Sequence, residues 1–198
     1  MKKAIKKLMT LVLCASMIFG VSSKASALEP RDTAYPASIY GPSYWQNSAY
    51  KSAGVMNAST DGNVSNLTKV NLYPRTTDNT DITTRTQMFY VMNIDNYGLR
   101  MYVRDQYNPL QGTGFTLNRY TVSPTSNGYR CVLYENLPSE APYSVIDLRT
   151  VASPNKYRIQ LVSGSYYLSA TSANSSEYLR WTSYQENDKF AWESVVFN

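Results

Sequence analysis

The C-terminal stretch Lys156–Phe197, KYRIQLVSGSYYLSATSANSSEYLRWTSYQENDKFAWESVVF, decides the fold. Short runs that alternate apolar and polar residues are separated by polar turns, which is the pattern of half-buried strands. Aromatic residues gather around Trp181 and Trp192 in this stretch. Because Leu179 and Phe190 alternate with these two tryptophans, we expect both indoles to lie in the core and not on a ligand-binding surface.

Weaker copies of this pattern fill the chain before it. Glycine, asparagine and proline lie in the breaks between the runs, where turns need them. No window shows the spacing of an amphipathic helix. Roughly eleven short strands in a domain of this length predict a closed barrel or a sandwich. The predicted strands are Ala49–Met56, Lys69–Tyr73, Gln87–Asn93, Leu99–Asp105, Phe115–Tyr120, Tyr129–Glu135, Tyr143–Val151, Lys156–Val162, Tyr166–Ala170, Tyr178–Thr182 and Phe190–Phe197.

The predicted strands group into an internal repeat. Each unit has an aromatic-rich strand, a polar loop, a short strand with a central aromatic, a turn and a further strand. The units span about 49–98, 99–164 and 165–198 within a single β domain, 49–198. Three units of this size favour a barrel with threefold repetition.

The segment Gly164–Trp192 resembles the β-trefoil family, and within it the ricin-type lectins. A glycine turn, a Tyr-Leu strand, a loop and a second strand with an aromatic follow one another as in that family. Gln87-Met88-Phe89 is similar to the Gln-x-aromatic element of the family, whereas the corresponding places near Lys189 and Tyr129 lack the glutamine. The resemblance implies an all-β, trefoil-like barrel of three repeats and sugar binding. An antiparallel β-sandwich is the alternative fold.

The first 27 residues have the form of a secretory signal peptide. Four lysines precede an apolar core at Leu8–Val21, and Ala25-Ser26-Ala27 supplies the small residues of a cleavage site. The core is too short for a membrane anchor, so we expect a secreted, extracellular protein without membrane insertion, cleaved after Ala27 and of bacterial origin. The following segment, 28–48, is rich in proline and tyrosine and predicts an extended arm.

Removing the signal peptide changes the charge of the protein. Its five lysines leave 14 basic residues against 14 acidic ones. Binding to nucleic acid or to an anionic membrane requires a surplus of positive charge, so neither partner is expected. One cysteine remains, Cys131 within the strand-like run YRCVLYE, and a buried small hydrophobe is the favoured interpretation.

The chain contains no histidine, which restricts the chemistry that it can perform. Ser-His and Cys-His catalysis and histidine-containing zinc sites are excluded. No metal and no cofactor are expected, and no catalytic residue stands out. A pair of carboxylates that hydrolyses glycosides needs no histidine and stays open, although no pair is marked in the sequence. The expectation is a protein that is not an enzyme.

Composition favours a glycan ligand or a cell-surface polysaccharide. The chain has 18 tyrosines and three tryptophans, with asparagine and serine in its loops. Flat rings stack on sugars while amides and carboxylates bind their hydroxyls. The predicted ligand-binding residues are Tyr167, Asn174, Tyr184, Gln185, Asn187 and Asp188.

A protein partner is the alternative to a glycan. The segment Asn136–Tyr143 contains two prolines and is predicted to project as a stiff loop. Such a loop would suit a hydrolase inhibitor or a component of a toxin or adhesion complex.

Overall fold

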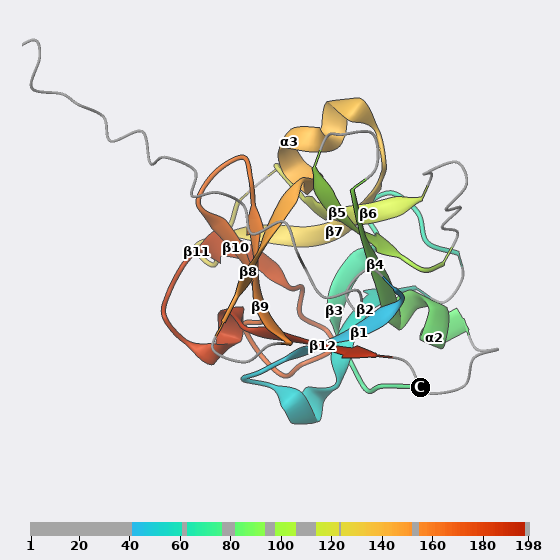
Figure 1. The fold of residues 1–198 in the computed structure, drawn as a ribbon, viewed down its shortest axis with the longest axis vertical. Helices are drawn as coiled ribbons and strands as arrows, with labels where there is room; N and C mark the ends of the chain where they lie inside the picture. Colours follow the sequence, from blue (N-terminus) through green and yellow to red (C-terminus); the bar gives the residue numbers. More distant parts are fainter. Residues whose placement is uncertain are drawn as a thin grey trace, which may run out of the picture. The chain divides into compact units, whose positions relative to one another are not determined.

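The computed structural model describes residues 41–60, 63–76, 82–93, 98–105, 114–122, 124–151 and 155–196. They belong to one compact unit, Pro36–Asn198. The expected signal peptide and the arm up to residue 40 lie outside the described residues. The described chain forms a single 12-stranded sheet, which confirms the all-β prediction (Figure 1). The strands are β1 (Ser43–Asn47), β2 (Val55–Ser59), β3 (Lys69–Tyr73), β4 (Met88–Asn93), β5 (Leu99–Val103), β6 (Phe115–Arg119), β7 (Tyr129–Glu135), β8 (Ile146–Thr150), β9 (Lys156–Leu161), β10 (Tyr166–Ser169), β11 (Arg180–Ser183) and β12 (Trp192–Val196).

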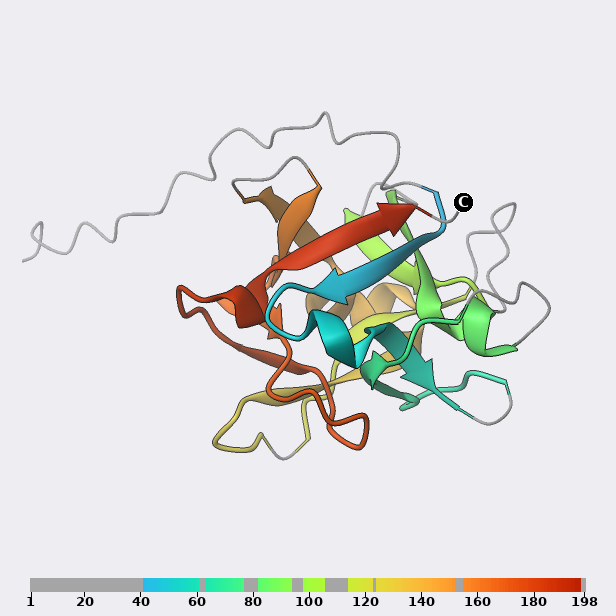
Figure 2. The same cartoon turned by 90° about the horizontal axis from the view of Figure 1, so that it is seen from below.

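Strand pairing closes the sheet on itself. The ring runs from β1 to β4, β5, β8, β9 and β12, and every neighbouring pair is antiparallel. β12 returns to β1 over five registered pairs, from Ser43↔Val196 to Asn47↔Trp192. Figure 2 shows these two strands side by side. This closed barrel leaves no free edges in the ring, and it decides between the two predicted architectures in favour of the barrel.

The remaining strands form the hairpins β2–β3, β6–β7 and β10–β11. Their second strands meet one another, since Lys69 of β3 pairs with Val132 of β7 and Arg130 of β7 pairs with Arg180 of β11. The backbone amide of Leu179 also donates to the carbonyl of Val70 at 2.8 Å. The hairpins therefore join into a layer that packs on the ring.

Three fully buried tryptophans occupy the core. Trp45, Trp181 and Trp192 each have 0% exposure, which confirms the core placement predicted for the last two. The indole N–H of Trp181 donates to the carbonyl of Asn118, and that of Trp192 donates to the carbonyl of Leu168. Each buried aromatic ring removes roughly 150–250 Å² from water, so these residues are major contributors to stability.

The N-terminal boundary of the barrel differs from the prediction. Ser43–Asn47 was expected in a proline-rich arm, yet it forms β1 and closes the ring. The strand predicted at Ala49–Met56 begins later, because the 3-10 turn η2 (Lys51–Ala53) precedes β2. Gly54 joins them with a φ of 108°, and an added Cβ would lie 1.9 Å from the carbonyl oxygen of Tyr73. This close approach requires glycine.

Short helices occur where the sequence predicted none. They are α2 (Ile82–Gln87), α3 (Ala141–Ser144) and the 3-10 turns η3 (Pro138–Glu140) and η4 (Asp188–Phe190). Helices of one or two turns are too short to show a hydrophobic period. The strand predicted at Tyr143–Val151 therefore begins only at Ile146, and the predicted extended loop Asn136–Tyr143 is largely helical.

The other buried groups agree with a structural role. Cys131 is completely buried, as predicted, and burial raises the pKa of its thiol, which makes the thiolate rare.

Among the described residues, no cluster of three or more potential metal ligands occurs. In that same part of the chain, no helix is long and apolar enough to cross a membrane.

Candidate functional site

A cavity of about 260 Å³ lies between the β6–β7 hairpin and the helical segment that follows it. Tyrosines, an amide, a carboxylate and a guanidinium line this cavity together with aliphatic side chains. The lining residues are Leu67, Asn118, Arg119, Tyr120, Thr121, Val122, Val132, Tyr134, Glu140 and Tyr143. Flat rings beside hydrogen-bonding groups are the combination expected for a sugar site, but the residues that supply them here differ from the predicted ones.

Two prolines organise the helical wall of the cavity. Pro138 and Pro142 begin η3 and α3 at first-turn positions, where the missing N–H costs nothing. The hydroxyl of Ser144 donates to the carbonyl of Glu140 at 2.9 Å, and the hydroxyl of Ser163 donates to the carbonyl of Pro142. These contacts fix the turn that carries Glu140 and Tyr143. Figure 1 shows α3 beside β6 and β7.

Asn118 connects the cavity to the core. It is 3% exposed, and its side-chain amide donates to a carboxylate oxygen of Glu140 at 3.1 Å. Its backbone carbonyl accepts the indole N–H of Trp181 at 3.1 Å. A buried, doubly anchored residue of this kind holds Glu140 in a defined position at the cavity wall.

Arg119 is surrounded by tyrosine rings. Its guanidinium carbon lies 4.8 Å from the ring centres of both Tyr129 and Tyr166, and 5.3 Å from that of Tyr143. The rings of Tyr129 and Tyr166 meet edge to face at 5.3 Å. A hydrogen bond with Tyr166 raises the pKa of the Tyr129 phenol and Arg119 opposes this effect. The rings hold the arginine through cation–π attraction.

A second, smaller cavity of about 120 Å³ adjoins the first. Leu67, Tyr120 and Val132 line both cavities, and Arg130 and Tyr178 complete the second. The guanidinium carbon of Arg130 lies 4.9 Å from the ring centre of Tyr178. We call the combined lining of the two cavities the β6–β7 groove.

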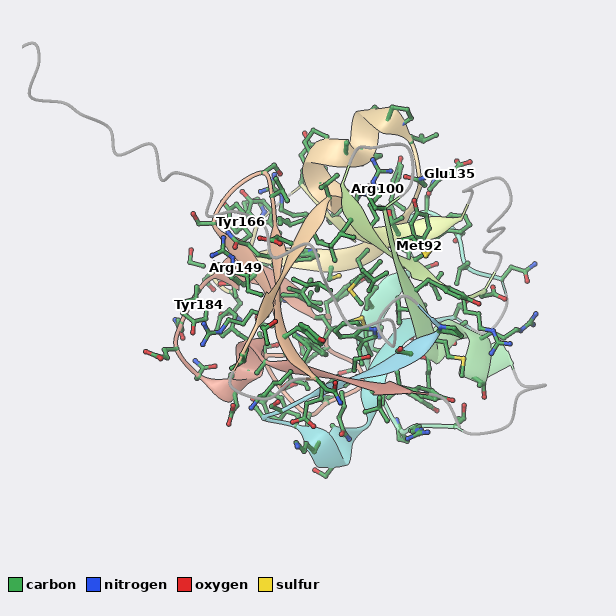
Figure 3. All side chains as sticks on the ribbon, in the orientation of Figure 1. Met92, Arg100, Glu135, Arg149, Tyr166 and Tyr184 are labelled. Carbon is green, nitrogen blue, oxygen red and sulfur yellow. The ribbon has the colours of Figure 1, made fainter. Side chains whose placement is uncertain are left out.

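The structure brings together some of the sequence-predicted site residues. The rings of Tyr167 and Tyr184 lie 5.0 Å apart, and Tyr184 also contacts the ring of Phe190 at 5.4 Å. Arg158 lies over the ring of Tyr184, with its guanidinium carbon 4.6 Å from the centre. Tyr166 and Tyr184 lie on the β10–β11 side of the molecule (Figure 3). The Tyr184 ring is thus already covered in part by the protein's own arginine.

The predicted polar partners stabilise local turns. The Asn187 side chain accepts from the amide of Lys189 at 3.0 Å, and Asp188 forms a 3.1 Å ion pair with Lys156. Gln185 is exposed, and its carbonyl accepts from the amide of Asn187. Gln185 and Asn187 lie in the turn that leads into η4, and Asp188 is the first residue of η4.

Asn174 is separated from the other predicted site residues. It lies in the closed loop of the β10–β11 hairpin, whereas Tyr184 follows the open end. Its side chain accepts from the amide of Ser176 at 2.9 Å, as in an ordinary turn. None of the six predicted residues lines the β6–β7 groove.

Sequence reasoning missed the groove because its residues come from separate segments. Asn118 and Arg119 end β6 and Tyr120 follows it, whereas Glu140 and Tyr143 lie in a segment noted only for its prolines. The available signal was Pro138 and Pro142 immediately after an aromatic strand, which places a rigid turn beside it. Glu140 is the single carboxylate among the lining residues, so the described groove lacks the carboxylate pair of a glycosidase.

Comparisons with solved structures identify the class of fold. A ricin B-like lectin from Macrolepiota procera in complex with lactose is 14% identical, with a TM-score of 0.58 over 81% of this chain and 99% of the lectin. The designed threefold-symmetric protein ThreeFoil is 13% identical, with a TM-score of 0.57 over 78% of this chain and 97% of the design. An exo-β-1,3-galactanase from Clostridium thermocellum is 14% identical, with a TM-score of 0.60, and the match covers 31% of that enzyme.

The fold is therefore that of the β-trefoil proteins, and the chain resembles the ricin-like members of this class. This agrees with the resemblance found in Gly164–Trp192. No protein-family model matches the sequence, and no curated protein matches it either. At sequence identities of 13–14%, the structural similarity defines the fold only. The ligand must therefore be inferred from the residues that line the groove.

Proposed function

We propose that this protein is a secreted, lectin-like glycan-binding protein without catalytic activity, and that the β6–β7 groove is its ligand site. The observation that carries the proposal is the lining of the larger cavity. Tyr120, Tyr134 and Tyr143 offer rings there, while Asn118 and Glu140 offer an amide and a carboxylate. Tyrosine rings stack on the apolar faces of sugars, and the polar groups bind hydroxyls.

The fold supports this proposal in a general way. A protein with the same fold, the Macrolepiota procera lectin, is described in complex with lactose. Loops on a rigid β scaffold are common places for binding sites. The single carboxylate in the groove favours binding over glycoside hydrolysis.

A glycan array tests the proposal, with the Tyr120→Ala variant for comparison. Tyr120 lines both cavities, so its removal is expected to weaken binding about tenfold or more. Tyr73→Ala is the matched control, because Tyr73 is 42% exposed on β3 and lines neither cavity. Absence of any glycan signal from the folded protein would refute the proposed function.

The proposal includes secretion. The support is the basic, apolar and small-residue pattern of residues 1–27, and the balanced charge that follows it. Balanced charge also supports a partner other than nucleic acid or an anionic membrane. The secreted protein is expected to begin at Leu28. N-terminal sequencing checks this expectation, and a secreted protein that still carries residues 1–27 would contradict it.

A protein partner is the second candidate function, and the rim of the groove favours it. Leu67 and Val122 are 49% and 57% exposed, and neighbouring exposed apolar residues are typical of interaction sites. The partner would be a hydrolase or a member of a toxin or adhesion complex. Assays of secreted proteases and glycosidases test inhibition, with Val122→Ser expected to relieve it; unchanged rates across the panel contradict an inhibitor.

We further propose that three related four-strand units build the barrel. Grouping the strands as β1–β4, β5–β8 and β9–β12 gives each unit two ring strands and one hairpin. This division moves the strand predicted at Lys156–Val162 from the second unit to the third. The supporting observation is that the β1–β2, β5–β6 and β9–β10 contacts recur in equivalent places. In this division, most of the groove lies in the second unit. A circular permutant that starts at residue 98 is expected to fold, because the cut falls between two units. Failure of the permutant to fold would contradict the division.

A further inference from the structure

We propose that the β6–β7 groove selects a glycan that carries a carboxylate group, and that Arg119 binds this carboxylate. The inference rests on the proposed glycan-binding function and specifies its ligand class. Arg119 lines the larger cavity and forms no ion pair with any described acidic residue. Its Nε is buried without a hydrogen-bond partner. A cation with a buried donor that has no partner is costly unless a ligand supplies one.

The surroundings of Arg119 leave its donors available. The contacts with the rings of Tyr129, Tyr143 and Tyr166 are cation–π contacts, which do not use the in-plane N–H groups. A guanidinium fork matches the two oxygens of a carboxylate, and fixed rings reduce the entropy lost when that pair forms. Arg119 is therefore held ready for a planar anion.

The presence of Glu140 restricts the expected class of ligand to anions that also carry hydroxyl groups. It lines the same cavity and is fixed by the Asn118 amide at 3.1 Å. A small anion without hydroxyls would be repelled by this carboxylate and would offer it no donor. A sugar acid places its carboxylate at Arg119 and donates hydroxyls to Glu140, so both charges are matched.

The second cavity extends the site. Arg130 and Lys69 approach the ring of Tyr178 at 4.9 and 5.9 Å, and Arg130 and Tyr178 line that cavity. Since Leu67 and Tyr120 border both cavities, a ligand longer than one sugar ring reaches the second cationic region. The groove thus fits a short acidic oligosaccharide better than a single sugar.

Calorimetric titration with paired probes tests the inference. The first pair is a galacturonate oligomer and its methyl ester, and the second is sialyllactose and its methyl ester. Each pair differs only in whether the carboxylate is free, and the two pairs distinguish a uronic acid chain from a terminal sialic acid. We expect one acidic probe to bind at least tenfold more tightly than its neutral partner, with a preference that falls in 0.5 M salt because screening weakens charge attraction.

Arg119→Gln is expected to remove this preference, so that the acidic and neutral probes bind the variant with equal affinity. Arg119→Lys keeps the charge without the fork, so it is expected to retain part of the preference and serves as the second variant if the first fails to fold. Arg158→Gln is the matched control, since Arg158 also stacks on a tyrosine but lines neither cavity. It is expected to behave as the unaltered protein does.

The following results overturn the inference. Equal binding of the acidic and neutral probes retains glycan binding but removes the acidic ligand. A preference that folded Arg119→Gln keeps, or that folded Arg119→Lys keeps undiminished, removes the role of Arg119. Binding of no probe, together with an empty glycan array, rejects the proposed function itself.

Discussion

Arginine–tyrosine contacts recur across this tyrosine-rich protein. Arg75 lies over Tyr44, Arg130 over Tyr178 and Arg158 over Tyr184, in addition to the group around Arg119. Such contacts contribute about 0.5–1 kcal/mol each at exposed sites. The abundance of tyrosine therefore serves stability as well as binding, and composition alone does not separate the two uses.

Glu193 provides a pH-dependent test at the residue scale. It forms a 2.8 Å ion pair with Lys51 and accepts from Ser48. The hydrogen bond with Lys51 lowers the pKa of the Glu193 carboxyl, although partial burial opposes this. The folded state thus favours the ionised form, so its stabilising effect is full above the unfolded pKa and is lost as the pH falls through the folded pKa.

We expect Glu193→Gln to reduce the free energy of unfolding by up to about 1 kcal/mol at neutral pH. The difference from the unaltered protein should shrink in acid. Urea unfolding over a range of pH measures this, with Glu177→Gln as an exposed control. A difference that is constant with pH, or that grows in acid, contradicts the assigned ion pair.

At the scale of elements, one buried side chain ties α2 to the segment after β3. Gln87 is 0% exposed; its amide donates to the carbonyl of Pro74 at 2.8 Å, and its oxygen accepts from the amide of Thr76 at 2.9 Å. The Tyr44 hydroxyl donates to the carbonyl of Thr76. The glutamine of the Gln-x-aromatic element therefore has a structural role here.

Gln87→Ala is expected to lower the free energy of unfolding by about 1–3 kcal/mol. The variant removes both hydrogen bonds of the buried Gln87 side chain, to the amide of Thr76 and the carbonyl of Pro74, and each such bond contributes about 0.5–1.5 kcal/mol. Chemical denaturation measures the change. Gln46→Ala is the control: its amide makes an exposed contact with the carbonyl of Lys51, so a change below about 0.5 kcal/mol is expected. Equal effects of the two variants contradict the role given to Gln87.

The elements that could be predicted are those with a strong local signal. Alternation predicted strands at Phe115–Tyr120 and Tyr129–Glu135, close to the observed β6 (Phe115–Arg119) and β7 (Tyr129–Glu135). β1 was missed because prolines at 30, 36 and 42 precede it, and its strand form depends on pairing with β12 at the other end of the chain. The helices were missed because they are shorter than any periodic window.

At the scale of the whole molecule, features that depend on local patterns could be predicted from the sequence, whereas features that form only when the barrel closes could not. The all-β barrel followed from strand count and turn chemistry, and the core tryptophans followed from alternation. The groove did not, because Leu67, Tyr120, Glu140 and Tyr178 lie far apart in sequence and meet only when the hairpins join. The six predicted ligand-binding residues all come from the C-terminal segment, where the alternation of apolar and polar residues is clearest. The fold brings Tyr167 and Tyr184 of this segment together, but Asn174 lies at the opposite end of the hairpin.

The most direct test of the account is an NMR titration of the ¹⁵N-labelled protein with the glycan that binds most tightly on the array. If the β6–β7 groove is the ligand site, the amide signals of Asn118, Tyr120 and Tyr143 will shift, and those of Tyr184 and Asn187 will stay in place. Shifts confined to Tyr184 and Asn187, with none in the groove, would contradict the account and return the site to the residues predicted from sequence.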